Sequence, residues 1–459
     1  MNLDVVVRSG SVATATSTVI TDIGIFDGRI AAFGSGLDAP EVIEAVGMTV
    51  VPGAVDVHTH FGNEVGGVPT LDDYESGSRA AALGGVTSFI NFAFQVPGQT
   101  LVAAVVDERN KALAESHLDF GLHVVVTDPS TVDLTRELPE LVELGVTSLK
   151  VFMAGAGLGL SRDHLITVLG AAAEAGLLVN VHAEDGPLVD HLTRRLLANG
   201  QRAPKYLPLA RPPEAEALAI SLVAGYAKLL GCAVYIVHVS CRAALEAIRQ
   251  ARLGGAEVYV ETRPAYLYLN SDRYEVEGSR ANEYVCWPPL RQPDDQAALW
   301  DGIRSGEIQT YATDHATWSS DQKAEVSTGF HDVAPGMSSI QTSIGLLYAE
   351  GVSRNRLSVS RFVELTATNP AKLFGLWPRK GSLALGSDAD LVILDPKRTV
   401  RIAATQMASK TDFDPFDGWR MTGWPILSMV RGKVIMKDGR MIDEHRRGTF
   451  QLRGRAQPL

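Results

Sequence analysis

Segments that read as β-strands alternate with segments that read as helices from residue 53 to residue 378, and this alternation constrains the fold more than any other feature. Eight such units, spread over about 300 residues, predict an α/β fold in the form of a (β/α)8 barrel. The strands are predicted at 55–60, 88–92, 122–126, 149–153, 178–182, 234–239, 258–262 and 310–314. Helices are predicted, among other places, at 72–83, 102–116, 163–175, 214–230, 242–252 and 294–303.

The two ends of the chain differ from this pattern, because short apolar strands there are separated by Gly, Ser and Asp-Gly turns. Strand character is present throughout residues 1–52 and returns at 386–395 and 428–436. We therefore expect two domains. A small β-sandwich is built from residues 1–52 and 379–459, and the barrel is built from residues 53–378. The basic tail, 446–459, is expected either to pack as an arm or to be disordered.

The composition of the chain limits which classes of partner and which cellular location are expected. The 459 residues carry a formal net charge of -11 and have no basic stripe, so nucleic acid and anionic membranes are poor partners. No apolar run approaches the roughly 18 residues of a membrane span, and the N-terminus does not read as a signal peptide. The cysteines are odd in number and form no Cys-x-x-Cys motif, which favours a reducing cytoplasm. They are Cys232, Cys241 and Cys286.

Polar residues stand at the ends of five of the predicted apolar strands. His58 and His60 follow one strand and share a face, because strand side chains repeat every two residues. Active sites of (β/α)8 barrels lie at the C-terminal ends of the strands. Any one of these groups could be a core residue bonded to backbone carbonyls, but six of them at one mouth indicate a metal site. The six are His58, His60, Lys150, His182, His238 and Asp314.

Lys150 differs from the other five residues because an ammonium beside metal ions is repelled. Either this lysine points away, or it has become an anion. A neutral lysine amine can react with carbon dioxide to give a carbamate, whose two oxygens can bridge two metals. The segment around Lys150 therefore suggests a binuclear site.

These six residues resemble the ligand set of the amidohydrolase superfamily, and the chain resembles more closely its dihydropyrimidinase/hydantoinase group of cyclic amidohydrolases. The likeness covers essentially the whole chain. The further motifs that carry it are Arg79-Ala-Ala-Ala-Leu-Gly-Gly-Val-Thr87, Val-His182-Ala-Glu-Asp-Gly, Arg211-Pro-Pro-Glu214, Trp287-Pro-Pro-Leu-Arg291, Asn369-Pro-Ala-Lys-Leu-Phe-Gly375 and Gly386-Ser-Asp-Ala-Asp390.

The resemblance implies a role for each residue. His58, His60 and Asp314 hold one metal, and His182 and His238 hold the other. Carboxylated Lys150 (N6-carboxylysine) and a hydroxide bridge the two ions. Asp314 acts as general base and then as general acid. Zinc is the expected metal, and manganese, cobalt or iron would also accept these ligands. The family also implies a homo-oligomer, either a dimer or a tetramer.

The sequence departs from the family where substrate is held. Hydantoinases typically carry a Tyr, thought to donate to the oxyanion, at the position of Gly155. The Ser usual before Pro-Pro-Leu-Arg is Trp287, and an Asn-Gly pair reads Ser338-Ser339. Loss of an oxyanion donor can cost about 2.7–4 kcal/mol. Gly155, Trp287 and Ser338 are therefore candidate substrate contacts, and a flat or aromatic substrate is expected.

The sequence thus predicts a binuclear-metal hydrolase that opens a cyclic amide C–N bond by attack of a metal-bridging hydroxide. The substrate would be a hydantoin, a dihydropyrimidine or a related imide. One alternative is an allantoinase-like ureide hydrolase. Another is a catalytically inactive scaffold relative, which the intact ligand set disfavours.

Several other residues receive structural interpretations. His315 is expected to face away from Asp314, and Cys286 is expected to be buried. Glu184 and Asp185 either support His182 or lie in a solvated loop.

Overall fold

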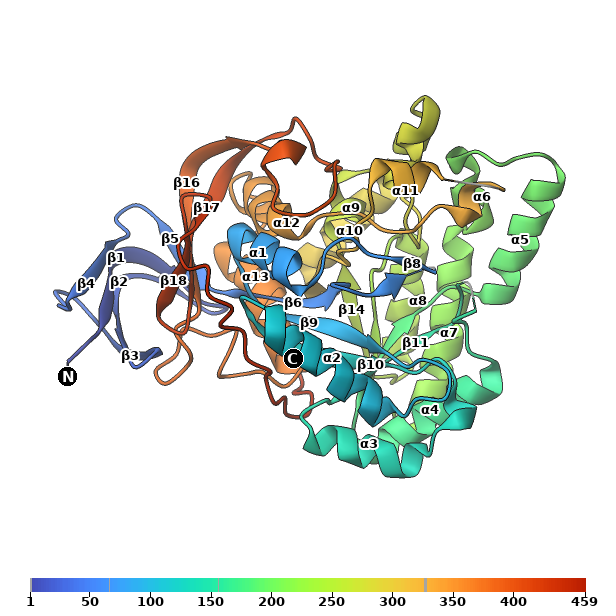
Figure 1. The fold of residues 1–459 in the computed structure, drawn as a ribbon, viewed down its shortest axis with the longest axis horizontal. Coiled ribbons are helices and arrows are strands. Elements are labelled where there is room, and N and C mark those ends of the chain that lie inside the picture. The colour runs from blue at the N-terminus through green and yellow to red at the C-terminus, as the bar shows by residue number, and fades with distance from the viewer. Residues whose placement is uncertain (1, 66, 156, 326–327) are drawn as a thin grey trace.

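The computed structural model describes residues 2–65, 67–155, 157–325 and 328–459. Its centre is an eight-stranded sheet in the order β15-β14-β13-β12-β11-β10-β9-β6 (Figure 1). The ends of this sheet meet, because the His60 backbone N–H donates to the His315 carbonyl at 3.0 Å. The predicted barrel is therefore confirmed. Its strands are β6 (Ala54–Thr59), β9 (Val86–Phe94), β10 (Asp119–Val125), β11 (Ser148–Phe152), β12 (Leu178–His182), β13 (Val234–Ile236), β14 (Val258–Thr262) and β15 (Thr310–Tyr311).

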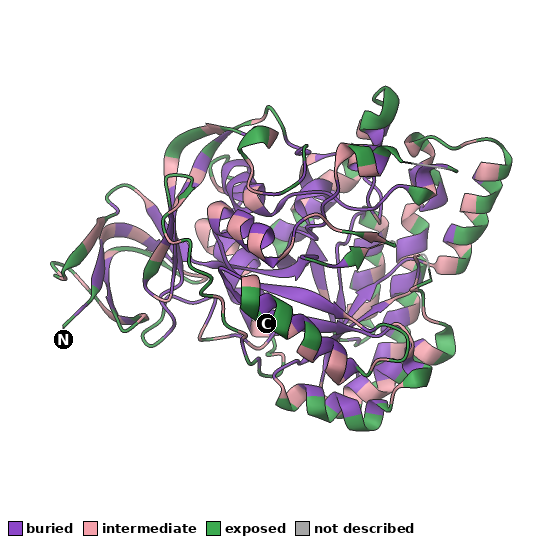
Figure 2. Ribbon diagram, viewed as in Figure 1, coloured by how far each residue is buried: buried purple, intermediate pink, exposed green. Residues whose placement is uncertain are grey.

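Helices surround the barrel and bury the side that faces it (Figure 2). Their ends follow local sequence signals. Thr100 and Ser161 accept backbone N–H groups at the starts of α2 and α4, and Gly176 ends α4 with a φ of 70°. The longer helices are α1 (Tyr74–Gly84), α2 (Leu101–Glu115), α3 (Leu134–Glu143), α4 (Arg162–Ala175), α5 (Gly186–Ala198), α7 (Pro213–Leu230), α8 (Arg242–Leu253), α10 (Pro293–Ser305) and α12 (Ile340–Leu347).

Shorter elements complete the barrel domain. The helices are α6 (Leu207–Ala210), α9 (Pro264–Tyr268), α11 (Ser320–Ala324), α13 (Val359–Val363) and α14 (Asn369–Leu373), and a small hairpin is formed by β7 (Glu64–Val65) and β8 (Val68–Pro69). No helix in the described part of the chain is long and apolar enough to cross a membrane.

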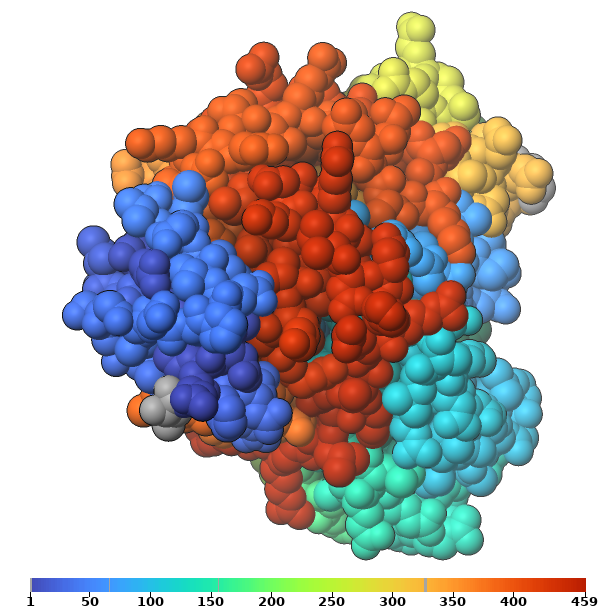
Figure 3. Space-filling view, turned by 60° about the vertical axis from the view of Figure 1, so that its left-hand side comes forward, coloured from blue at the N-terminus to red at the C-terminus, as the bar shows by residue number. Residues whose placement is uncertain are grey.

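Both ends of the chain build a second, nine-stranded mixed sheet. The two ends meet where Val51 of β5 pairs antiparallel with Val392 of β16. In the space-filling view, the blue N-terminal and red C-terminal segments form one continuous surface (Figure 3). The strands are β1 (Val5–Ala13), β2 (Thr18–Phe26), β3 (Arg29–Gly34), β4 (Glu41–Glu44), β5 (Thr49–Pro52), β16 (Leu391–Arg401), β17 (Arg420–Val430), β18 (Lys433–Lys437) and β19 (Arg440–Met441).

This second unit has its own apolar core, in which Val7, Ile23, Leu391 and Met429 are buried. Two of these residues come from each end of the chain, so neither end could bury its apolar face alone. The fold class is therefore confirmed, with a barrel and a small β domain from both chain ends. The division at residues 52/53 and 378/379 stays a prediction.

The tail beyond residue 446 packs as an arm. Gln451 donates its backbone N–H to the Phe120 carbonyl at 2.8 Å, and Gly454 donates to the Gly375 carbonyl at 2.9 Å. Arg453 is buried and donates to the hydroxyl of Ser148 on β11 at 3.0 Å. Of the two expectations for this segment, the packing arm is the correct one.

Candidate metal centre

The six residues predicted to bind metal all line one cavity at the C-terminal ends of the barrel strands. Each follows or ends an apolar strand, so the barrel itself brings them together from distant parts of the sequence. The cavity-lining set contains His58, His60, Lys150, His182, His238 and Asp314.

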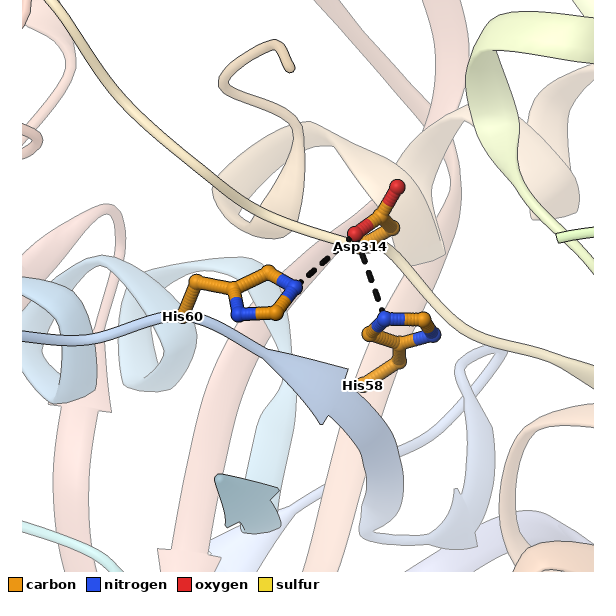
Figure 4. Close-up of side chains that lie close together, drawn as sticks. All are labelled: His58, His60 and Asp314. Atoms are coloured by element: carbon orange, nitrogen blue, oxygen red, sulfur yellow. Dashed lines mark ion pairs between the residues drawn. The ribbon is translucent and has the colours of Figure 1, made fainter. Parts of the chain in front are cut away.

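Three of the six form a tight group (Figure 4). The Nε2 atoms of His58 and His60 each lie 3.2 Å from Oδ1 of Asp314. Ligand atoms held about 2.0–2.1 Å from one ion at a tetrahedral angle lie about 3.3 Å apart. The spacing and the donor set of this group therefore fit one divalent cation.

Neighbouring side chains orient these two imidazoles. Nδ1 of His58 donates to Oε1 of Glu261 at 2.8 Å, which leaves the lone pair of Nε2 free. Glu261 is buried and also accepts from the Tyr235 hydroxyl at 2.9 Å. Nδ1 of His60 lies 3.4 Å from the amide oxygen of Asn63.

His182 and His238 form a second convergent pair. Nδ1 of His182 lies 3.0 Å from Nε2 of His238, a separation that two ligands of one ion also have. Nε2 of His182 donates to Glu184 at 2.8 Å, so its Nδ1 carries the free lone pair. Glu184 forms a buried ion pair with Arg211. This pair is one reason why the pKa of Glu184 falls to about 2 although burial alone would raise it. Glu184 thus lies against His182 and not in a solvated loop.

The protonation states of the centre suit metal binding. Burial lowers the pKa of His60, His182 and His238. Burial alone would raise the pKa of Asp314, but Arg263 and the histidines hold it well below its usual range. Neutral imidazoles and an ionised carboxylate are the forms that ligate metals.

Two of the candidate ligands sit on strained backbone. His238 has a φ of 42° and Asp314 has a φ of 49°, and a left-handed conformation is uncommon for residues other than glycine. Such strain persists where the surrounding structure imposes it, and it is concentrated at functional sites. Here it follows strands β13 and β15, which end at Ile236 and Tyr311.

Lys150 lines the cavity and is 1% exposed. Its Nζ sits 5.4 Å from the ring centre of Phe92 and 4.9 Å from that of Phe152. Among the described residues it forms no ion pair. Burial lowers the pKa of this amine to about 8.

The remaining wall of the cavity is apolar, and Gly155 and Trp287 are part of it. A Cβ on Gly155 would meet only Trp287, at 3.9 Å. The guanidinium carbon of Arg211 lies over the Trp287 ring, 4.1 Å from the ring centre. Ser338 is buried but is not among the residues that line this cavity, so its contact with substrate stays a prediction.

His315, Asp185 and Cys286 have structural roles outside the group of candidate metal ligands. Nε2 of His315 donates to Asp72 at 2.9 Å, and its Nδ1 accepts the backbone N–H of Ser339 at 3.1 Å, so it faces away from the centre. Asp185 caps helix α5 through the N–H of Leu188. Cys286 is fully buried.

Glu261 and Arg263 were not identified from the sequence. Both lie at the end of β14, where the pattern Val-Tyr-Val-Glu-Thr-Arg places polar residues after an apolar strand. The same signal that identified Asp314 was therefore present there.

Comparison with known proteins gives consistent matches. The profile of the Amidohydrolase family matches residues 49–435. The D-hydantoinase of Geobacillus stearothermophilus is 38% identical over 454 residues, which cover 98% of this chain and 96% of that protein. The D-phenylhydantoinase of Escherichia coli O7:K1 is 36% identical over 455 residues, 98% of each chain.

Solved structures agree with these sequence matches. The crystal structure of dihydropyrimidinase from Brevibacillus agri NCHU1002 superposes with a TM-score of 0.96 at 36% identity, covering 99% of each chain. The L-hydantoinase (dihydropyrimidinase) from Arthrobacter aurescens superposes with a TM-score of 0.89 at 30% identity, covering 98% of this chain and 99% of that one.

Proposed function

The chain belongs to the amidohydrolase family, and on this premise we propose that it hydrolyses the C–N bond of a small cyclic amide. Hydantoins, dihydropyrimidines and related imides are the substrate class. The similarity to D-hydantoinases, a D-phenylhydantoinase and dihydropyrimidinases over nearly the full chain supports this choice. The observation that carries the proposal is the convergence of six metal-type donors on one cavity.

The residues present fit a pair of divalent cations. His58, His60 and Asp314 would hold one ion, and His182 and His238 would hold the other. When bound, such ions polarise the carbonyl under attack and acidify a water molecule. Zinc is the proposed metal, with manganese, cobalt and iron as the other candidates.

Lys150 is proposed to be carboxylated by carbon dioxide and to bridge the two ions. The neutral amine is the form that reacts with carbon dioxide, and a pKa of about 8 gives an appreciable neutral fraction near pH 7–8. An uncharged or anionic group also removes the repulsion that an ammonium would exert on the cations.

Asp314 is proposed to carry the proton in the reaction. It would take the proton of the attacking hydroxide and deliver it to the leaving ring nitrogen, as general base and then general acid. The apolar wall of the cavity, which includes Phe94, Phe152 and Trp287, would limit the access of bulk water to this transfer.

Gly155 and Trp287 are proposed to select larger or flatter rings than hydantoin itself. Gly155 leaves space beside Trp287, and the indole can stack on a planar substituent. We expect kcat/KM to rise from unsubstituted hydantoin and dihydrouracil to aryl-substituted rings and cyclic imides, because that ratio reports transition-state discrimination. A clear preference for the small rings would contradict this assignment.

The activity is tested by assaying metal-loaded protein against cyclic amides, cyclic ureides and imides and detecting the ring-opened product. Turnover of cyclic amides or imides is the expected result. Turnover of allantoin alone would favour the ureide hydrolase. Bound metal with no turnover of any ring would favour the inactive scaffold.

We also propose a cellular location and an assembly state. The three cysteines are free and buried, which is compatible with a reducing cytoplasm. A homo-oligomer, either a dimer or a tetramer, is proposed from the family relationship.

A further inference from the structure

Arg263 contacts the carboxylate of Asp314 through the oxygen that the histidines do not use. Strands β14 and β15 pair in parallel with Thr262 opposite Tyr311, so the residues that follow the two strands emerge side by side. Nη1 of Arg263 donates to Oδ2 of Asp314. Oδ1 of the same carboxylate faces the imidazoles of His58 and His60. Each oxygen of Asp314 therefore has a separate partner.

The arginine lies behind Asp314 and not in the cavity. Its side chain is 2% exposed, and it is not among the residues that line the cavity. Its guanidinium carbon lies 4.5 Å from the ring centre of Tyr266, which packs on it as a cation–π partner. Arg263 is thus placed to act on Asp314 and not on a substrate.

Asp314 is the one carboxylate in ion-pair contact with Arg263 among the residues that the structure describes. Within the same residues, Nε and Nη2 of the guanidinium have no hydrogen-bond partner. A buried guanidinium with so few partners destabilises the folded protein unless its ion pair with Asp314 is kept. The contact therefore constrains the carboxylate as strongly as it does the arginine.

We propose that Arg263 is a positioning residue that holds Asp314 with Oδ1 toward the metal site and Oδ2 away from it. Without this contact the carboxylate could turn about its side-chain torsions and present either oxygen, or both, to the ion. Partners that orient a ligand in this way typically change metal affinity by about 10–100-fold. The inference rests on the metal site of the proposed function, but it does not depend on which ring is the substrate.

The test compares Arg263→Met and Arg263→Lys with the wild-type full-length protein. The affinity for Zn²⁺ is measured by competition with a chelator, with and without millimolar guanidinium ion. Arg361→Met is the matched control, because Arg361, like Arg263, is an arginine of the barrel domain that forms an ion pair with one carboxylate, that of Glu364, yet it does not line the cavity. Circular dichroism and thermal unfolding establish that each variant is folded.

We expect Arg263→Met to bind Zn²⁺ about 10–100-fold more weakly than the wild type. Guanidinium ion should restore part of this loss in Arg263→Met and have no effect on the wild type or on Arg361→Met. Arg263→Lys should be intermediate, because it keeps the charge but lacks the planar fork. If Arg263→Met does not fold, Arg263→Lys and its smaller expected loss carry the test.

Wild-type Zn²⁺ affinity in a folded Arg263 variant would overturn the inference. So would a loss that is equal in both variants and insensitive to guanidinium ion, because general structural damage would behave in that way. A wild-type protein that binds Zn²⁺ but hydrolyses no cyclic amide would reject the proposed activity and leave this test intact.

Discussion

Two of the candidate metal ligands are each held by a buried carboxylate on the far side of the imidazole ring. His58 is held by Glu261 and His182 by Glu184, and both carboxylates are fully buried. Each contact fixes which ring nitrogen carries the proton, and so which nitrogen is free to bind a metal. The protein itself therefore orients these two imidazoles.

Glu261→Gln should weaken the binding of Zn²⁺ by the group of His58, His60 and Asp314. The amide can accept from His58 through its oxygen, but it lacks the charge that favours the required tautomer. We expect the affinity for Zn²⁺ to fall about 10-fold, at the low end for residues that contact a ligand. Glu257→Gln is the control, because Glu257 is exposed and immediately precedes β14, and it should not change the affinity for Zn²⁺. Unchanged affinity in Glu261→Gln would show that the ring is oriented by other contacts.

Lys150→Ala should lose metal and activity together. The carbamate that would bridge the ions cannot form without the amine, and the two ions would be left to repel each other. Metal analysis and the ring-opening assay measure the two losses, and millimolar acetate should restore part of both. Intact-mass or density evidence for an unmodified lysine in the active, metal-loaded protein would contradict the proposal.

Part of this centre could be predicted from the sequence and part of it could not. His58 and His60 are two residues apart on a strand, so their shared face follows from local geometry. Glu261 is 203 residues from His58 in the sequence, and its contact depends on how β6 and β14 face each other inside the barrel. A single sequence contains no signal for a contact between residues so far apart in the chain, although it does place Glu261 and Arg263 at a strand end.

At the scale of elements, strands β13 and β15 end earlier than the sequence pattern predicts. The apolar runs suggest strands to residues 239 and 314, but the hydrogen-bonded strands stop at Ile236 and Tyr311. The chain then turns so that His238 and Asp314 adopt positive φ values. Apolar periodicity does not register this departure, because the residues stay buried after they leave the sheet.

The segment between β16 and β17 contains a buried carboxylate with a raised pKa. Asp414 is 6% exposed, and burial raises its pKa to about 7. Its carboxylate accepts the backbone N–H of Phe416 at 2.8 Å. Between about pH 4 and pH 7 the folded protein therefore holds a proton that the unfolded chain has released, so this residue lowers stability as the pH rises through that range.

Asp414→Asn should remove the loss of folding stability that Asp414 causes as the pH rises. The amide oxygen can still accept from Phe416, so the turn is retained. We expect no gain in stability near pH 4 and a gain on the order of 2–4 kcal/mol above pH 7, where the wild type carries the full cost of a buried charge. Thermal unfolding of both proteins from pH 4 to pH 8.5 measures the difference. A difference that stays constant across this range would mean that Asp414 does not titrate there.

At the scale of the whole molecule, a buried ion cluster joins the barrel to the sheet of the chain ends. Lys380 has a fully buried side chain, and its Nζ lies 2.6 Å from Asp119, 3.0 Å from Asp388 and 2.7 Å from Asp390. Asp119 begins barrel strand β10, and Asp390 immediately precedes β16 of the second sheet. The sequence shows Gly386-Ser-Asp-Ala-Asp390 as a motif, but the third carboxylate is that of Asp119, 261 residues before Lys380 in the sequence.

Lys380→Met should therefore destabilise both units at once. Methionine fills a similar volume but leaves three carboxylates close together without their common cation, and breaking a buried charge pair typically costs about 3–5 kcal/mol. Lys410→Met is the matched control, because the ion pair of Lys410 with Asp73 is nearly half exposed and should contribute less than about 1 kcal/mol. Urea unfolding followed by tryptophan fluorescence measures both variants. Similar, small losses in the two would mean that the carboxylates are neutralised by protons or by Arg431, which also contacts Asp119, and that Lys380 is not what joins the two units.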